Sequence, residues 1–168
     1  KFLSNIRETD AILEVVRIFD DPDVIHVEGG IDPKRDIEVI NLELILSDLE
    51  TVTKRLGNLV SEIKKGSKSA VIENVGLQKI KSSLEMGLFA RISPLDEMEL
   101  PLIKQLNLLT MKPVLYALNK KGGGKNLDEI KDPRFDEVVQ YIEQDLKSRH
   151  ILFDAKSEDE MKDFSPEE

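Results

Sequence analysis

Residues 42–63, LELILSDLETVTKRLGNLVSEI, decide the fold, because their apolar side chains return at alternating steps of three and four residues. The members of this stripe are Leu42, Ile45, Leu49, Val52, Leu56, Leu59 and Ile63. The spacing places all of them along one side of an α-helix for three heptads. We therefore expect a long helix whose apolar side is covered by another element.

A second helix is expected after the polar loop of residues 64–69, KKGSKS. Its apolar stripe consists of Ile72, Val75, Ile80, Leu84 and Leu88, with Leu77 beside it. Two such stripes joined by a short loop predict an antiparallel helical hairpin, a coiled coil in which each stripe covers the other. A core-facing helix of a bundle would show the same periodicity, so this alternative stays open.

Outside the hairpin, three apolar runs are typical of strands buried in a parallel sheet. They cover residues 10–19, 113–118 and 151–155. Between the last two lies a helical pattern over residues 135–146, which Asp132 and Pro133 would start. A strand, a helix and a strand in this order indicate a βαβ unit. The fold class predicted is α/β, with residues 1–40 and 101–168 in one domain and residues 41–100 in an inserted hairpin.

Composition narrows the function classes. The 168 residues carry a net charge of −9, which argues against a surface built throughout to bind nucleic acid. The chain has no cysteine, which excludes a thiolate metal site. With only two histidines, His26 and His150, we do not expect a histidine-rich metal centre, and we expect both residues to be structural. No apolar run approaches the roughly 20 residues that span a bilayer. We expect a soluble, cytoplasmic protein without membrane contact.

Two short motifs lie at the ends of the predicted strands, where open parallel sheets bind ligands. Asn119 and Lys120 follow one strand, and Asp154, Ala155 and Lys156 follow the next. In P-loop GTPases an NKxD run and a Ser-Ala-Lys run at these places contact the base. A polar strand end explains each motif alone better than a binding role does, but the two motifs support each other because they follow successive strands with one helix between them.

The carboxylate of NKxD is missing here, because its place is taken by Gly122. The glycine run that follows does not form a phosphate-binding loop either. Aligning Gly124 and Lys125 on GxxxxGK[ST] leaves Asn126 where a hydroxyl is needed and Asn119 where the first glycine is needed. We expect a flexible surface loop there.

Basic residues gather around the expected hairpin tip. The stretch from residue 54 to residue 81 carries +5, whereas residues 157–168 carry −5. Candidate contacts to RNA or the ribosome are Lys54, Arg55, Lys64, Lys65 and Lys68. No aromatic residues are interleaved with them, so such contacts would be to phosphates. A solvated helix surface would show the same charges.

Longer stretches of the sequence resemble the YchF family of Obg-like ATPases. They are FLSNIRETDAI from Phe2, VVR from Val15, HV from His26, DPKRDIEVIN from Asp32, and LNLLTMKPVLY from Leu106. The resemblance implies a P-loop type α/β domain of the TRAFAC class, interrupted by a helical hairpin. It also implies a ribosome-associated hydrolase that prefers ATP to GTP and carries NxxE instead of NKxD.

By this resemblance, Asn119, Lys120, Ala155 and Lys156 form the base side of a nucleotide site. Because Gly122 matches neither Asp nor Glu, weak discrimination between bases becomes conceivable. The family's P-loop, switch segment and DxxG motif would precede Phe2, and its TGS domain would follow Glu168. We therefore expect an internal piece of a longer protein, with ATP or GTP and Mg²⁺ bound only by the intact parent and no catalytic or metal-binding residue in this chain.

Alone, this chain is expected to bind nucleotide poorly and to hydrolyse none. Two alternatives are a helical-hairpin module that binds the ribosome, RNA or a protein without nucleotide chemistry, and a structural domain whose nucleotide motifs are idle. The oligomeric state is left open.

Overall fold

The computed structural model describes residues 2–20 and 30–161. The chain divides into two compact units, one made of Lys1–Asp10 with Ile40–Pro113 and the other of Ala11–Val39 with Val114–Glu168. The first unit is helical, and the second is an α/β unit. The predicted domain boundaries at residues 40 and 101 stay a prediction.

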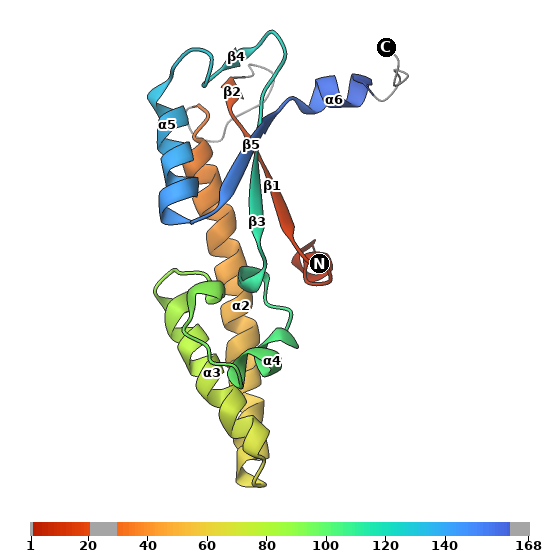
Figure 1. Cartoon of the computed structure of the whole chain (residues 1–168), viewed down its shortest axis with the longest axis vertical. Helices are drawn as coiled ribbons and strands as arrows, with labels where there is room; N and C mark the ends of the chain where they lie inside the picture. The colour runs from red at the N-terminus through yellow and green to blue at the C-terminus, as the bar shows by residue number, and fades with distance from the viewer. Residues whose placement is uncertain (1, 21–29, 162–168) are drawn as a thin grey trace. The chain divides into compact units, whose positions relative to one another are not determined.

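The helical unit is built on the antiparallel pair of α2 (Pro33–Lys64), which enters it at Ile40, and α3 (Lys68–Glu85), as Figure 1 shows. The predicted hairpin is confirmed. The shorter elements of the unit are α1 (Phe2–Ile6), η1 (Ala90–Ile92), α4 (Glu99–Lys104) and η2 (Leu109–Met111). Of these, α4 packs closely on α3, since a Cβ added at Gly76 would lie 3.1 Å from Cβ of Glu99.

The turn of the hairpin is short because two residues terminate the helices on either side of it. Gly66 has a φ of +86°, a left-handed conformation in which glycine carries no steric cost, and its N–H donates to the carbonyl of Ile63. The Oγ of Ser67 then accepts a hydrogen bond from the N–H of Ala70 and caps α3. The predicted loop thus becomes a tight turn.

The heptad stripe of α2 is only partly buried. Ile45, Val52 and Leu59 are core residues, but Leu42 is 53% exposed. Leu44, which lies outside the stripe, is buried instead. A straight α-helix of 3.6 residues per turn drifts away from a heptad pattern. The description of this pair as a coiled coil therefore stays a prediction.

The α/β unit contains a parallel three-stranded sheet in the order β1-β3-β5. The strands are β1 (Ile12–Arg17), β3 (Val114–Asn119) and β5 (Arg149–Phe153), which confirms the predicted α/β class. Between β3 and β5 lie α5 (Pro133–Gln140) and a single π-helical turn, η3 (Tyr141–Asp145). A small antiparallel pair, β2 (Phe19–Asp20) with β4 (Lys125–Asn126), and α6 (Ala155–Met161) complete the unit.

Helix α5 starts as predicted, because the Asp132 carboxylate accepts a hydrogen bond from the N–H of Arg134 and Pro133 occupies the first turn. The last strand differs from the predicted 151–155. It begins at Arg149, since polar residues are tolerated in an edge strand, and it ends before Asp154, which caps α6.

One side of the sheet forms the core of this unit, with Tyr116, Leu118 and Val16 buried. On the opposite side Leu13 and Val15 are each 58% exposed. In the described part of the chain, no helix is both long and apolar enough to cross a membrane. His26 lies outside the described residues, and His150 lies in β5 with its Nδ1 3.2 Å from Oε1 of Glu143.

Candidate functional site

The carboxyl ends of β3 and β5 lie side by side, because Asn119 pairs with Phe153 in the register of the sheet. The Oδ1 of Asn119 accepts a hydrogen bond of 3.0 Å from the N–H of Ala155. The N–H of Lys120 donates to the carbonyl of Phe153 at 2.8 Å. The two motifs named from the sequence are thus joined directly, at an edge where parallel sheets bind ligands.

The side chain of Lys120 is held by two carboxylates. Its Nζ lies 2.7 Å from Oδ2 of Asp128 and 2.7 Å from Oε1 of Glu129. The hydrogen bonds that Lys120 donates to Asp128 and then to Glu129 raise the pKa of Lys120, and the bond between Lys120 and Glu129 lowers the pKa of Glu129. The aliphatic part of Lys120 is therefore fixed in one place beside Asn119.

Asp154 organises the other motif. Its Oδ1 accepts hydrogen bonds from the N–H groups of Lys156 (3.0 Å) and Ser157 (3.3 Å), and its Oδ2 accepts one from Oγ of Ser157 (3.0 Å). The nearby backbone N–H of Gly122 also favours the ionised form of this carboxyl and so lowers its pKa. Desolvation raises the pKa of Asp154, but these hydrogen bonds together lower it by more, so the group titrates below an ordinary aspartate.

Asn126 is a structural residue of this region that sequence reasoning missed. Its Oδ1 accepts from the N–H of Lys121, and its Nδ2 donates to the carbonyl of Lys121 and to Oε2 of Glu129. These contacts close the glycine-rich loop, with Gly123 at a φ of +68°. The polar residues Asn126, Asp128 and Glu129 were the available signal, since they supply partners for Lys120 and Lys121.

Nothing in residues 2–20 or 30–161 brings three or more His, Asp or Glu side chains together as metal ligands.

The candidate RNA contacts separate into two groups. Lys54, Lys64, Lys65 and Lys68 are exposed, and the last three lie at the tip of the hairpin. Arg55 is instead paired within the hairpin. Its guanidinium contacts Glu73 at 2.7 and 2.8 Å and Glu62 at 2.7 and 3.3 Å. The hydrogen bonds to Glu73 and Glu62 raise the pKa of Arg55.

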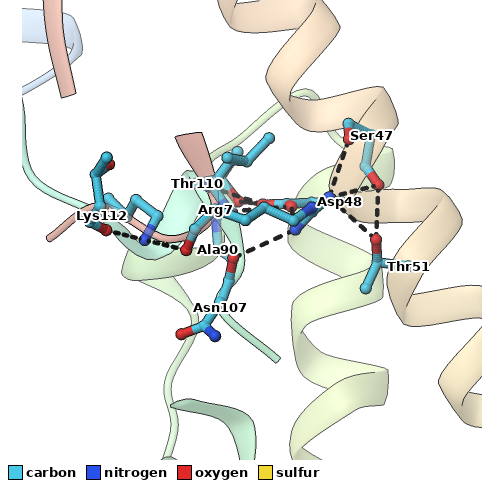
Figure 2. Close-up of polar contacts among 10 residues, drawn as sticks. Arg7, Ser47, Asp48, Thr51, Ala90, Asn107, Thr110 and Lys112 are labelled. Carbon is cyan, nitrogen blue, oxygen red and sulfur yellow. Dashed lines mark hydrogen bonds and ion pairs between the residues drawn. The ribbon is translucent and has the colours of Figure 1, made fainter. Parts of the chain in front are cut away.

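A separate polar cluster in the helical unit surrounds Asp48, whose side chain is fully buried (Figure 2). Its carboxylate accepts from NH1 of Arg7 (2.9 Å), from the N–H of Leu109 (3.0 Å) and from both the N–H and Oγ1 of Thr110 (2.7 Å each). Arg7 also donates to Ser47 and Thr51 of α2. Every interaction of Asp48 is internal, so this cluster is structural.

Beside this cluster, an open groove of about 710 Å³ follows α2. Its polar lining carries both signs of charge, including Arg7, Lys54, Glu43 and Glu50. The mixed charge selects no class of ligand.

Comparison with known proteins identifies the relatives of this chain. No family model matches it. The chain is similar to a protein of Bacillus subtilis named "Ribosome-binding ATPase YchF", with 43% identity over all of this chain and 45% of the relative. It is also similar to "Obg-like ATPase 1" of Saccharomyces cerevisiae, with 35% identity over 99% of this chain and 43% of the relative.

The chain belongs to the YchF family of Obg-like ATPases. The solved structure of the YchF GTPase of Schizosaccharomyces pombe matches its fold with a TM-score of 0.77 and 31% identity, covering 99% of this chain and 45% of that one. This YchF family chain thus spans less than half the length of these relatives. The names of these whole proteins describe an ATPase or a GTPase, and the name of the Bacillus subtilis protein also describes ribosome binding.

Proposed function

We propose that this chain is part of a longer YchF family protein in which it supplies the base side of a nucleotide site. The longer protein would hydrolyse ATP, or GTP, with Mg²⁺, in association with the ribosome in the cytoplasm. The hydrogen bond between Asn119 and the N–H of Ala155 carries the proposal. It joins the two motifs at adjacent strand ends, where Lys120, Ala155 and Lys156 would surround a base.

In this proposal, phosphate and Mg²⁺ chemistry belong to the P-loop, switch segment and DxxG motif of the longer protein. What this chain contributes is orientation of the base. The Asn119 amide ties the two loops, and the fixed stem of Lys120 offers an apolar surface to a ring.

Binding of ATP and GTP by the full-length protein tests the proposal. Asn119→Ala should weaken the affinity for both nucleotides about tenfold or more, since it removes the bond that joins the loops. Asn58→Ala, an exposed change on α2, is the matched control and should bind as the unchanged protein does. The isolated 168 residues should hydrolyse no ATP above a buffer blank. Equal affinity of the Asn119 variant, or turnover by the isolated chain, would contradict the proposal.

A second candidate function is ribosome or RNA binding through the hairpin tip, which is supported by the exposure of Lys64, Lys65 and Lys68. The +5 charge of residues 54–81 stands out in a chain of net charge −9. Arg55 is not part of this surface, because its guanidinium already donates hydrogen bonds to Glu62 and Glu73.

Replacing Lys64, Lys65 and Lys68 together by Glu should weaken ribosome binding, and binding by the unchanged protein should fall steeply as salt rises. Cosedimentation with ribosomes at several salt concentrations measures both effects. The matched control reverses charge at Lys104, an exposed lysine of α4. If the triple variant cosediments like the control, the hairpin tip is not the contact.

A further inference from the structure

Helix α2 carries a second stripe of apolar side chains, and this one faces solvent. Its positions recur at steps of four and three residues within the helical unit, and they are Leu42, Leu46, Leu49, Thr53, Leu56 and Val60. This spacing places them along one side of the helix over about five turns. Only Thr53 interrupts the apolar row.

The exposure of these side chains distinguishes this stripe from the buried side of α2. Leu42, Leu46 and Val60 are 53%, 55% and 52% exposed. The buried side is a different one and includes Val52 and Leu59. A row of leucine and valine side chains in water is unfavourable, and it marks a surface that another protein covers.

The charges beside the exposed stripe change sign along the helix. Glu43 and Glu50 flank its first half, whereas Lys54 and Lys64 flank its second half, and all four residues are exposed on the same edge of the stripe. A second α2 helix in antiparallel orientation would therefore place its basic half beside the acidic half of the first. A parallel orientation would bring like charges together, which is unfavourable.

The apolar side chains of the stripe also match in an antiparallel pair. With a twofold axis midway between Leu49 and Thr53, Leu46 would lie opposite Leu56 of the second copy. Leu42 would likewise lie opposite Val60 of the second copy. Such a twofold contact uses the same surface on both copies and closes at a dimer.

We propose that the exposed stripe of α2 is a self-association surface, on which a second copy of the protein docks antiparallel to form a twofold-symmetric dimer. This surface lies outside the proposed nucleotide site, and the inference does not depend on that site.

Sedimentation equilibrium of the full-length protein measures its mass at concentrations from about 1 to about 100 μM. The mass should rise to that of two chains within this range, as for a dissociation constant in the micromolar range. A protein that keeps the mass of one chain throughout overturns the inference. This is the result expected if another segment of the longer protein covers the stripe.

A charge placed within the stripe tests where the two copies meet. Leu46→Glu should weaken the dimer at least about tenfold, because the new carboxylate would be buried against Leu56 of the second copy. Met98→Glu introduces the same charge at an apolar side chain that is 64% exposed outside the stripe, so it is the matched control and should dimerise as the unchanged protein does. Equal dimerisation of the two variants would overturn the assignment of the surface.

Charge reversal tests the antiparallel orientation. In this orientation Glu50 lies beside Lys54 of the second copy, so Glu50→Lys and Lys54→Glu each place like charges together when the variant pairs with itself. Each variant alone should dimerise about tenfold more weakly. An equal mixture of the two should form a dimer about as readily as the unchanged protein, because opposite charges then meet on both sides of the axis.

The outcome of this mixing experiment is decisive in both directions. Single variants that dimerise like the unchanged protein, or a mixture that dimerises no better than they do, would overturn the antiparallel pairing. Since Glu50 and Lys54 are exposed, both substitutions leave the buried side of α2 intact.

Discussion

Asp48 holds α2 to η2 and to Arg7 through a carboxylate that water does not reach. Each of its partners is a donor, so removal of the carboxylate leaves several buried N–H and O–H groups without an acceptor. Such losses are costly because the groups gave up their hydration on folding.

Asp48→Ala should therefore lower the free energy of unfolding by about 3–5 kcal/mol, as for other buried partners of a charge. Urea titration followed by circular dichroism measures this. Glu50→Ala, an exposed change nearby on α2, should cost well under about 1 kcal/mol. Similar losses for the two variants would contradict the role of Asp48.

Glu14 on β1 makes the stability of the α/β unit depend on pH. Desolvation, followed by the nearby charge of Asp36, raises the pKa of Glu14 to about 7. Its Oε2 is buried without a hydrogen-bond partner. Between pH 4.5 and 7 the folded state therefore binds more protons at Glu14 than the unfolded state does, and the stability falls as pH rises through this window.

Glu14→Gln should consequently stabilise the protein at pH 8, by on the order of 2 kcal/mol after allowance for solvent screening, and have little effect at pH 4.5. Thermal or urea unfolding at the two pH values measures the difference. Glu38→Gln on the exposed side of α2 serves as control and should show no such dependence. An equal effect of Glu14→Gln at both pH values would refute this account.

Sequence reasoning reached Asn119 but not Asp48, and the reason is physical. Asn119 follows an apolar run that ends a strand, and its position implies a ligand edge. Asp48 lies among many charged residues of an amphipathic helix, and only tertiary packing buries it beneath Thr110. A single acidic residue among 33 carries no mark of its burial.

The hairpin contains two glycines whose replacement by alanine should have opposite effects on stability. Gly66 terminates α2 with a φ of +86°, whereas Gly57 lies inside α2 with open space around its Cα. Gly66→Ala forces a side chain into the left-handed region and should destabilise the protein by about 1 kcal/mol. Gly57→Ala removes backbone freedom from the unfolded chain and should stabilise it by about 0.5–1 kcal/mol.

Guanidinium unfolding of both glycine variants under the same conditions measures this opposition. A stabilising shift for Gly66→Ala would contradict the described turn, and a destabilising shift for Gly57→Ala would contradict the account of that position in α2.

The helices and strands with a long apolar pattern were predictable, but the residues at which they begin were less so. The pattern from Leu42 to Ile63 predicted a helix but not its start at Pro33, which the carboxylate of Asp32 sets by accepting from the N–H of Arg35. Likewise, β5 begins with polar Arg149. These boundaries depend on single hydrogen bonds and on the position of a strand at the edge of the sheet. Neither produces a periodic pattern of apolar residues that could be recognised in the sequence.

For the whole molecule, the resemblance seen in the residues agrees with the relatives at 43% and 35% identity. The α/β class and the hairpin could be predicted because both rest on long apolar patterns. The interplay of Gly122 with Asp154 could not, since it depends on where two loops meet. The net charge of −9 likewise hides the contrast between a basic hairpin tip and an acidic C-terminal stretch.

The strand order also has a consequence in time. β1 ends at Arg17, but its only neighbour in the described sheet, β3, begins at Val114. At synthesis rates of about 5–20 residues per second, β1 leaves the translating ribosome on the order of ten seconds before its partner is made. During that interval β1 has no pairing partner and Val16, which is 3% exposed in the folded protein, is uncovered, so this strand should reach its folded state only after the hairpin has been synthesised.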